Sequence, residues 1–96
     1  MLQTIIDAIR NKKVLTFTYD GHSRTVEPHT VGSSRAGNDV FRCFQTGGSH
    51  ATGGHDWNLC TVSKITNLQT PGSTFSGPRP GYQRGDKGMM TIYAEL

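Results

Sequence analysis

Tyr19 and Arg24 lie five residues apart in the stretch "YDGHSRTVEP", on either side of a predicted tight turn. An arginine guanidinium binds phosphate through two parallel N–H donors, and a tyrosine adds a stacking face and one hydroxyl. We therefore expect Tyr19 and Arg24 to bind an anion. The alternative is structural: Arg24 would pair with Glu27 or Asp20 at the surface while Tyr19 packs in the core.

A second group of basic and aromatic residues is spread over the predicted strands. They could complete a pocket of the kind that holds a nucleotide or single-stranded nucleic acid: His29, Arg42, Trp57 and Lys64. Taken alone, Trp57 is a better candidate for the core, because large aromatic side chains are mostly buried. Further along the chain, we expect a lid over this pocket from Arg79, Tyr82 and Arg84.

Two thiols and two imidazoles fall within one predicted hairpin: Cys43, His50, His55 and Cys60. Their spacing matches no familiar zinc finger, and both cysteines look like mid-strand residues, so we predict no metal site. The histidines lie in turns and loops without an evident carboxylate to orient them. We therefore predict neither an enzyme nor a cofactor.

The loop "TGGSHATGGH", residues 46–55, is rich in glycine and hydroxyl groups. Free backbone N–H groups in such a loop could form an anion nest. It lacks the Gly-Lys-Ser ending and the following helix of a phosphate-binding loop, and a plain hairpin loop explains it better.

The elements that must position these residues begin with a short helix. Over residues 2–13 the apolar residues Leu2, Ile5, Ile6 and Ile9 follow helical spacing, and basic residues come at the end. From Val14 the pattern alternates with period two, which indicates a strand, and Asp20-Gly21 marks a hairpin turn.

Further strands are expected at residues 24–31, 39–45 and 57–70, the last of them broken near Ser63 into two. Pro28 cannot donate a backbone hydrogen bond, so its strand must be an edge, bulged or sharply bent. Residues 71–88, "PGSTFSGPRPGYQRGDKG", are too poor in apolar side chains for a core element, and we name them the arm. The last segment, "MMTIYAEL", regains strand character, either in its own sheet or in a neighbour's.

Composition limits the class of protein. The 96 residues fit one small domain, and 33% hydrophobic residues with 12 glycines predict a thin core and little helix. A formal charge of +3 favours anionic partners but is low for a duplex-binding protein. Strand cysteines indicate a reducing compartment, and no membrane span or secretory signal is evident, so we expect a cytoplasmic protein.

The order of these elements resembles the WYL domain, a bacterial and phage sensor module with a small Sm-like, SH3-like β-barrel. "AIRNKKVLTFTYDGHSRTVEPHTVG" is similar to the family's opening helix, strand and Y-x-x-x-x-R-x-V-x-P signature, and "VFRCF" and "WNLCTVSKITNL" are weaker matches. The resemblance covers about residues 5–75. It implies that the positions of Tyr19 and Arg24 belong to an anion-binding surface.

Several features depart from the family pattern. The namesake Trp-Tyr-Leu triplet is absent, with Val40-Phe41-Arg42 in its neighbourhood, and Lys64 stands where the later arginine is usual. A changed pocket and a changed ligand follow from these differences. No helix-turn-helix segment precedes the matched part, so we expect no DNA-reading regulator of that design.

The sequence therefore predicts a mainly β fold: a short helix, then an Sm-like barrel of about five antiparallel strands in residues 1–75, then the rest of the arm and a C-terminal strand in residues 76–96. We expect a non-catalytic module that binds a nucleotide or nucleotide-derived signal, as a sensor or a sequestering protein, including the sequestering of a defence signal by a phage. The alternative is an Sm-like module for single-stranded nucleic acid or for a protein partner. Pairing of the last strand with a neighbour would make the chain a homo-oligomer.

Overall fold

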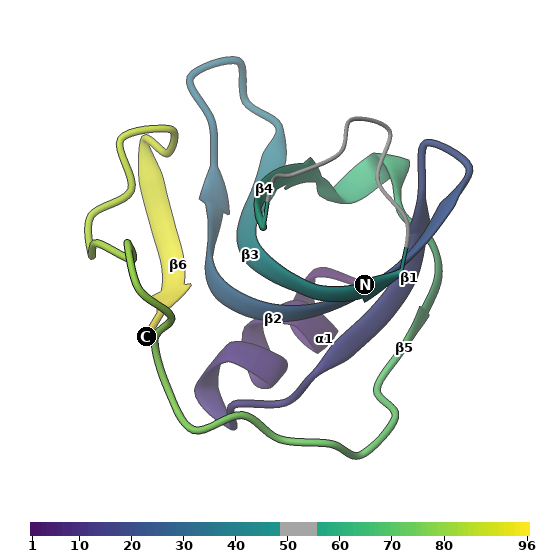
Figure 1. Cartoon of the computed structure of the whole chain (residues 1–96). Helices are drawn as coiled ribbons and strands as arrows, with labels where there is room; N and C mark the ends of the chain where they lie inside the picture. Colours follow the sequence, from purple (N-terminus) through teal and green to yellow (C-terminus); the bar gives the residue numbers. More distant parts are fainter. Residues whose placement is uncertain (49–55) are drawn as a thin grey trace.

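The computed structural model describes residues 1–48 and 56–96. Its elements are, in order, α1 (Leu2–Arg10), β1 (Leu15–Tyr19), β2 (His22–Ser33), β3 (Asp39–Gly48), β4 (Trp57–Thr61), the 3-10 helix η1 (Val62–Lys64), β5 (Thr66–Gln69) and β6 (Thr91–Glu95) (Figure 1). A short N-terminal helix followed by antiparallel strands confirms the mainly β class that the sequence predicts.

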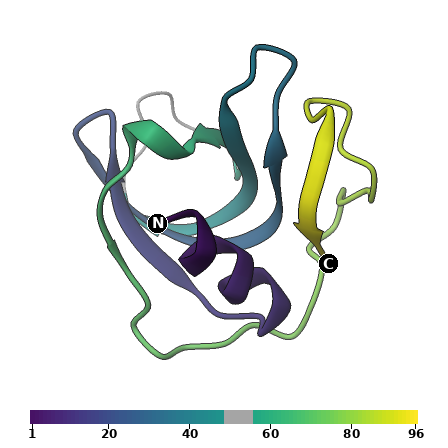
Figure 2. The ribbon, with the colours of Figure 1, turned by 180° about the vertical axis from the view of Figure 1, so that it is seen from behind.

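Helix α1 is amphipathic and buries one face. Ile5, Ala8 and Ile9 are buried, and the helix packs against β2 and β6 (Figure 2). The helix ends at Arg10, three residues earlier than predicted, and Lys12 has a φ of 52°, which a continuing α-helix does not allow. No helix in the described residues has the length and the apolar character needed to cross a bilayer.

The hairpin of β1 and β2 forms where the sequence predicts it. Asp20 and Gly21 both have positive φ, 52° and 75°, as the twist of a two-residue hairpin turn requires. Leu15 pairs with Val26 and Tyr19 with His22, so the register is continuous along the whole hairpin. Arg24 pairs with Phe17 and therefore shares a face with the core residues of β1.

Strand β2 is the centre of the sheet. Its first half pairs with β1, its second half pairs with β6, and β3 runs along its other edge. A register shift between Pro28 and Thr30 confirms the irregularity that the proline predicted. The final strand, β6, pairs with β2 of its own chain.

The sheet is not closed into a barrel, so the barrel expected from the sequence is wrong. The strand order is β4-β3-β2-β1-β5, with β6 beside β2, and among the described residues no ladder joins the two ends of this path. The chain leaves β4 into η1 instead of continuing as a strand that could close the ring. A side chain spans the gap: the Tyr19 hydroxyl accepts a hydrogen bond from the Thr61 N–H at 3.1 Å.

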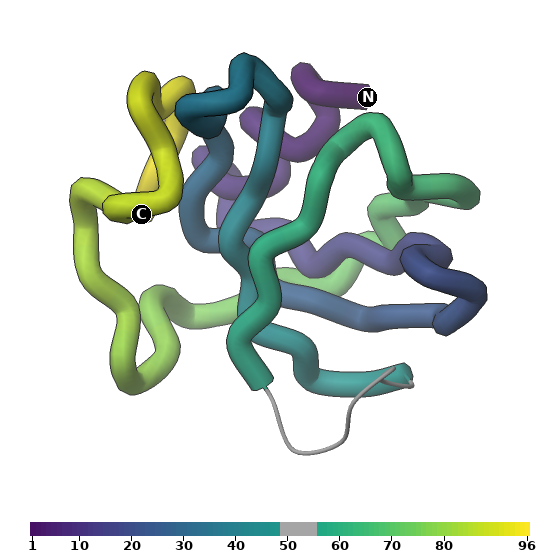
Figure 3. Tube along the Cα trace, turned by 90° about the horizontal axis from the view of Figure 1, so that it is seen from above, coloured from purple at the N-terminus to yellow at the C-terminus, as the bar shows by residue number. Residues whose placement is uncertain are grey.

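The two faces of the curved sheet have different coverings. Alternation along the strands puts one set of side chains in a single core with the buried side of α1: Leu15, Phe17, Val26, Val31, Phe41, Cys43 and Cys60. The opposite face of β2, β3 and β4 is covered by the arm. Figure 3 follows the arm from the end of β5 round to β6. We call the core side the inner face and the arm side the outer face.

Candidate ligand-binding cleft

The candidate residues divide between the two faces. Cys43 pairs with Asn58 and Phe44 pairs with Trp57, so alternate residues of β3 and β4 face opposite sides. Arg42 and Trp57 lie on the outer face, under the arm. Tyr19 and Arg24 lie on the inner face, so the structure does not bring the two predicted groups into one site.

His29 fastens the arm to the sheet. Its side chain is fully buried, Nδ1 lies 2.8 Å from the Glu27 carbonyl, and Nε2 accepts a hydrogen bond from the Arg79 N–H at 3.1 Å. Because Nε2 accepts, Nδ1 must carry the proton and donate. Burial lowers the pKa of His29 below its usual 6.5, which favours this neutral form. In this conformation His29 offers no exposed atom to a ligand.

Aromatic rings surround His29 on the arm side. The Phe75 ring is stacked on the imidazole at 5.7 Å, and the rings of Trp57 and Tyr82 lie 4.8 and 5.1 Å away. Phe75 and Tyr82 come from the chain beyond β5, and Trp57 begins β4. The arm is therefore packed through an aromatic cluster.

A buried carboxylate holds the arm beside this cluster. Arg79 donates from Nε and an Nη to the two Glu27 oxygens, at 2.7 and 2.9 Å. Its guanidinium also lies over the Phe44 ring, 4.9 Å from the centroid. Glu27, which the sequence offers as a partner for Arg24, is thus the partner of Arg79.

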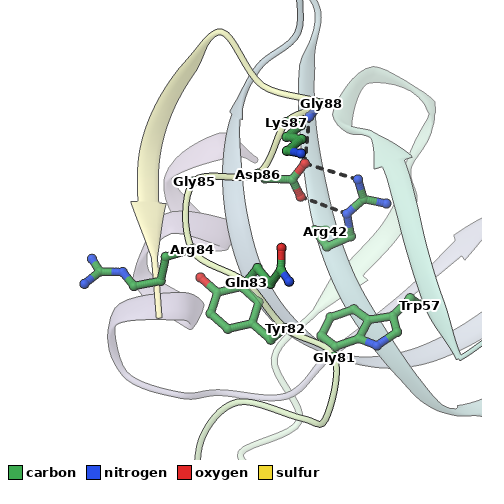
Figure 4. A pocket seen from close by; sticks show the side chains of 10 residues that line it. All are labelled: Arg42, Trp57, Gly81, Tyr82, Gln83, Arg84, Gly85, Asp86, Lys87 and Gly88. Atoms are coloured by element: carbon green, nitrogen blue, oxygen red, sulfur yellow. Dashed lines mark hydrogen bonds and ion pairs between the residues drawn. The ribbon is translucent and has the colours of Figure 1, made fainter.

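A cleft of about 410 Å³ lies between the arm and the outer face. Four of the predicted residues line it: Arg42 and Trp57 from the sheet, and Tyr82 and Arg84 from the arm. The other lining residues also belong to the arm, within residues 81–88 (Figure 4). The Trp57 and Tyr82 rings are nearly parallel, at 23° with centroids 6.4 Å apart. We call this site the arm cleft.

Both rings of the arm cleft are held by their polar atoms. The Trp57 Nε1–H donates to the Pro80 carbonyl at 3.2 Å. The Tyr82 hydroxyl accepts from Thr30 Oγ1 and donates to the Leu96 carbonyl, each at 3.2 Å. The polar atoms are thereby occupied, and the ring faces are what the two residues can offer to a ligand.

Arg42 is the cation on the sheet side of the arm cleft. Its Nε and Nη2 donate to the two oxygens of Asp86, at 2.8 and 3.2 Å. These bonds raise the pKa of Arg42 and lower that of Asp86, so both groups are charged at neutral pH. The pair is side-on and bidentate, the geometry with which a guanidinium also binds phosphate.

Two further cations line the arm cleft from the arm. Arg84 is largely exposed, pairs with Glu95 at 3.1 Å, and points away from Trp57 towards β6 (Figure 4). Lys87 is exposed and has no ion-pair partner within 4 Å among the residues that the structure describes. The arm cleft thus contains three cations and one lining carboxylate, Asp86.

On the inner face, Arg24 is a buried guanidinium. It is 6% exposed and its Nε has no hydrogen-bond partner within the described part of the chain. The guanidinium lies 5.0 Å from the centre of the Tyr19 ring, and an Nη is 3.5 Å from Asn58 Oδ1, which is long for a hydrogen bond. Arg24 forms an ion pair neither with Glu27 nor with Asp20. The alternative in which Arg24 pairs with one of these carboxylates at the surface is therefore wrong.

Cys43 and Cys60 are free and buried next to Arg24. The hydrogen bond with Cys43 lowers the pKa of Cys60, and the nearby positive charge of Arg24 acts in the same direction. Both cysteines lie within strands, as the sequence predicts, and both thiols are buried in the core. His50, His55 and the rest of the glycine-rich loop considered as an anion nest, apart from residues 46–48, lie outside the described residues. Within residues 1–48 and 56–96 no three metal-binding side chains cluster.

Lys64 is exposed at the end of η1 and does not line the arm cleft. Sequence reasoning missed two contacts: Asp86 forms an ion pair with Arg42, and Glu27 holds the arm through Arg79. The one signal in the sequence was "RGDKG", residues 84–88, where an acidic residue stands between two basic ones. This segment has no apolar side chain that could hold it against the core, so an ion pair is the contact that could order it.

Comparisons of the chain with protein-family models, with curated proteins and with solved structures found no match.

Proposed function

We propose that this chain is a non-catalytic binding module for a small anionic ligand with a planar ring, of the nucleotide class, which binds in the arm cleft. One observation carries the proposal: two nearly parallel aromatic rings and three cations line a single cleft of about 410 Å³. Cleft volumes of this order suit small molecules. A ring stacks on Trp57 or Tyr82, and an anionic group reaches Arg42 and Lys87.

The chemistry of the lining residues supports this class of ligand. Stacking of a base on an aromatic ring contributes about 1–3 kcal/mol, and charge-assisted contacts to phosphate contribute a similar amount. The resemblance of the sequence to the WYL sensor module points to the same kind of ligand. Such a module would either report to a separate partner or sequester the signal, as a phage protein that counters a host defence would do.

Trp57 is the only tryptophan of the chain and lines the arm cleft, so the fluorescence of the folded protein reports on this site. We would titrate the protein with AMP, ATP, adenosine and inorganic phosphate at fixed ionic strength. We expect AMP and ATP to change the Trp57 emission at lower concentrations than adenosine or phosphate, because only the nucleotides engage both the rings and the cations.

Two variants make the test specific. Arg42→Ala should weaken AMP binding about tenfold or more, since it removes a charge-assisted contact. Arg35→Ala removes the same charge from an exposed loop away from the arm cleft and should bind like the wild type. Equal effects of the two variants, or no response of Trp57 to any nucleotide, would contradict the proposal.

The same titration separates the rival function. A module for single-stranded nucleic acid would bind oligonucleotides with affinity that grows with their length and falls steeply with salt. A mononucleotide site would bind AMP, and its affinity for oligonucleotides would not grow with their length.

A further inference from the structure

Asp86 holds Arg42 in the way that a ligand would. Its two oxygens accept from Nε and Nη2 at 2.8 and 3.2 Å, so the side of the guanidinium that faces the arm cleft is occupied. The Asp86 side chain is only 10% exposed. A carboxylate and a phosphate present the same pair of oxygens to a guanidinium, so the two compete for one position.

The turn that carries Asp86 is shaped around this contact. Oδ1 also accepts from the Gly88 N–H at 2.8 Å, and the Asp86 carbonyl accepts from the Met89 N–H at 3.1 Å. A Cβ at position 88 would lie 3.2 Å from Asp86 Oδ1 and 3.5 Å from Arg42 Nη2. Glycine at this position therefore lets the turn approach Arg42 closely.

The turn is anchored on both sides, which limits what can move. On one side the Tyr82 hydroxyl bonds to Thr30 and to the Leu96 carbonyl. On the other side the Met90 N–H donates to the Ser33 carbonyl at 2.7 Å. Residues 83–89 therefore form a short loop between fixed points. Glu95 also holds the loop near its middle, where it accepts from the Gly85 N–H at 3.0 Å and pairs with Arg84. Gly85 has a φ of 73°, which glycine adopts without strain.

The charges of the arm cleft are mostly neutralised while this loop is in place. Arg42 is paired with Asp86 and Arg84 with Glu95, which leaves Lys87 as the lining cation without an ion pair in the described chain. An anion that enters this closed cleft meets the Asp86 carboxylate next to the guanidinium that it needs. Displacement of Asp86 removes that repulsion and exposes two N–H donors.

We propose that Asp86 is an internal competitor for the anionic group of the ligand: binding requires its carboxylate to leave Arg42, and the loop of residues 83–89 moves when the arm cleft is occupied. The identity of the ligand in this proposal rests on the proposed function, whereas the competition between Asp86 and an anion for Arg42 rests on the observed ion pair alone. The loop is thereby a conformational signal of occupancy that a partner protein could read.

Inorganic phosphate is the probe for this contact, because it contains the anionic group without a ring. We would follow its binding by the NMR signals of the Arg42 Nε–H and the Trp57 indole, in the wild type, in Asp86→Asn and in Asp7→Asn. Asp7 is exposed on α1, outside the arm cleft, so Asp7→Asn controls for the change in net charge. We expect Asp86→Asn to bind phosphate about tenfold more tightly than the wild type and Asp7→Asn to match the wild type.

A second measurement uses the unaltered chain, so that a folding defect of Asp86→Asn does not decide the question. Millimolar phosphate should speed hydrogen exchange at the Gly88 and Met89 amides relative to chloride at equal ionic strength, since both amides donate to Asp86. The amide of Met90 should change less, because it bonds to Ser33.

Affinity for phosphate that is equal or lower in Asp86→Asn, with unchanged exchange at Gly88 and Met89 in the wild type, would overturn the proposal. Phosphate binding that is enhanced in Asp86→Asn while AMP binds no better than phosphate would keep Asp86 as a competitor and reject the nucleotide class. AMP binding that is equal in wild type and Asp86→Asn would keep the proposed function and reject the role of Asp86.

Discussion

Arg24→Met should stabilise the fold, because Arg24 is a buried cation with only weak partners: the Tyr19 ring, the Asn58 amide and the Cys60 thiol. The unpaired Nε costs about 1–3 kcal/mol. The cation–π contact with the Tyr19 ring at 5.0 Å stabilises the folded state by about 0.5–2 kcal/mol. The 3.5 Å contact with Asn58 contributes less than a normal hydrogen bond. Methionine keeps most of the apolar contacts of the side chain and leaves a small void. We expect a net gain of about 1 kcal/mol, which is about 4–8 °C in melting temperature for a chain of this size.

The assay is urea unfolding followed by circular dichroism and by Trp57 fluorescence, which must agree for a two-state analysis. Arg35→Met is the matched control, since it removes the same charge from an exposed site and should change stability by less than about 0.5 kcal/mol. A loss of more than about 1 kcal/mol in Arg24→Met would refute the reasoning, because it would mean that the guanidinium is well partnered in solution.

Four further expectations concern the arm, the core and the oligomeric state. The pKa of His29 is about 6.5 in the unfolded chain and lower in the folded one, so below pH 6.5 unfolding takes up a proton. The free energy of unfolding is therefore full above pH 6.5 and falls by at most about 1.4 kcal/mol per pH unit as the pH drops towards the folded pKa. His29→Gln should remove this pH dependence in urea titrations. Tyr82→Phe should cost about 1–3 kcal/mol in the same assay, because it leaves the fully buried Thr30 hydroxyl without its acceptor. Cys43→Ser with Cys60→Ser should keep the circular dichroism spectrum at a modest loss of stability, and unfolding with release of zinc would contradict that view of the thiols. Sedimentation at micromolar concentration tests the homo-oligomer expected from the sequence, and a sharp monomer boundary would end that expectation.

Local patterns were sufficient to predict most of the elements. The i, i+3, i+4 spacing of Ile5 and Ile9 places the buried side of α1, and Asp20-Gly21 gives the hairpin turn with both residues at positive φ. Pro28 indicated an irregular strand, and a register shift lies there. These signals depend on neighbours in the sequence, which is why they could be identified without the fold.

The closure of the sheet and the partners of the charged residues depend on contacts between distant residues. Glu27 pairs with Arg79, 52 residues away, and Arg42 pairs with Asp86, 44 residues away. The arm looked like a connector because it is poor in apolar side chains. It is ordered by these ion pairs and by a few rings around His29, and no local pattern reports such contacts.

The division of the candidate residues between two faces gives the Arg24→Met variant a second use. Asn58 and Trp57 are consecutive in β4, and they face the inner and the outer side of the sheet respectively. If Arg24→Met stabilises the chain and leaves the AMP titration of Trp57 unchanged, the inner face is separate from the arm cleft, and the anion-binding role implied for Arg24 by the WYL resemblance does not apply to this ligand. If the variant stabilises the chain and abolishes the titration, the unfavourable burial of Arg24 serves binding, and β4 is the element through which the two faces are coupled.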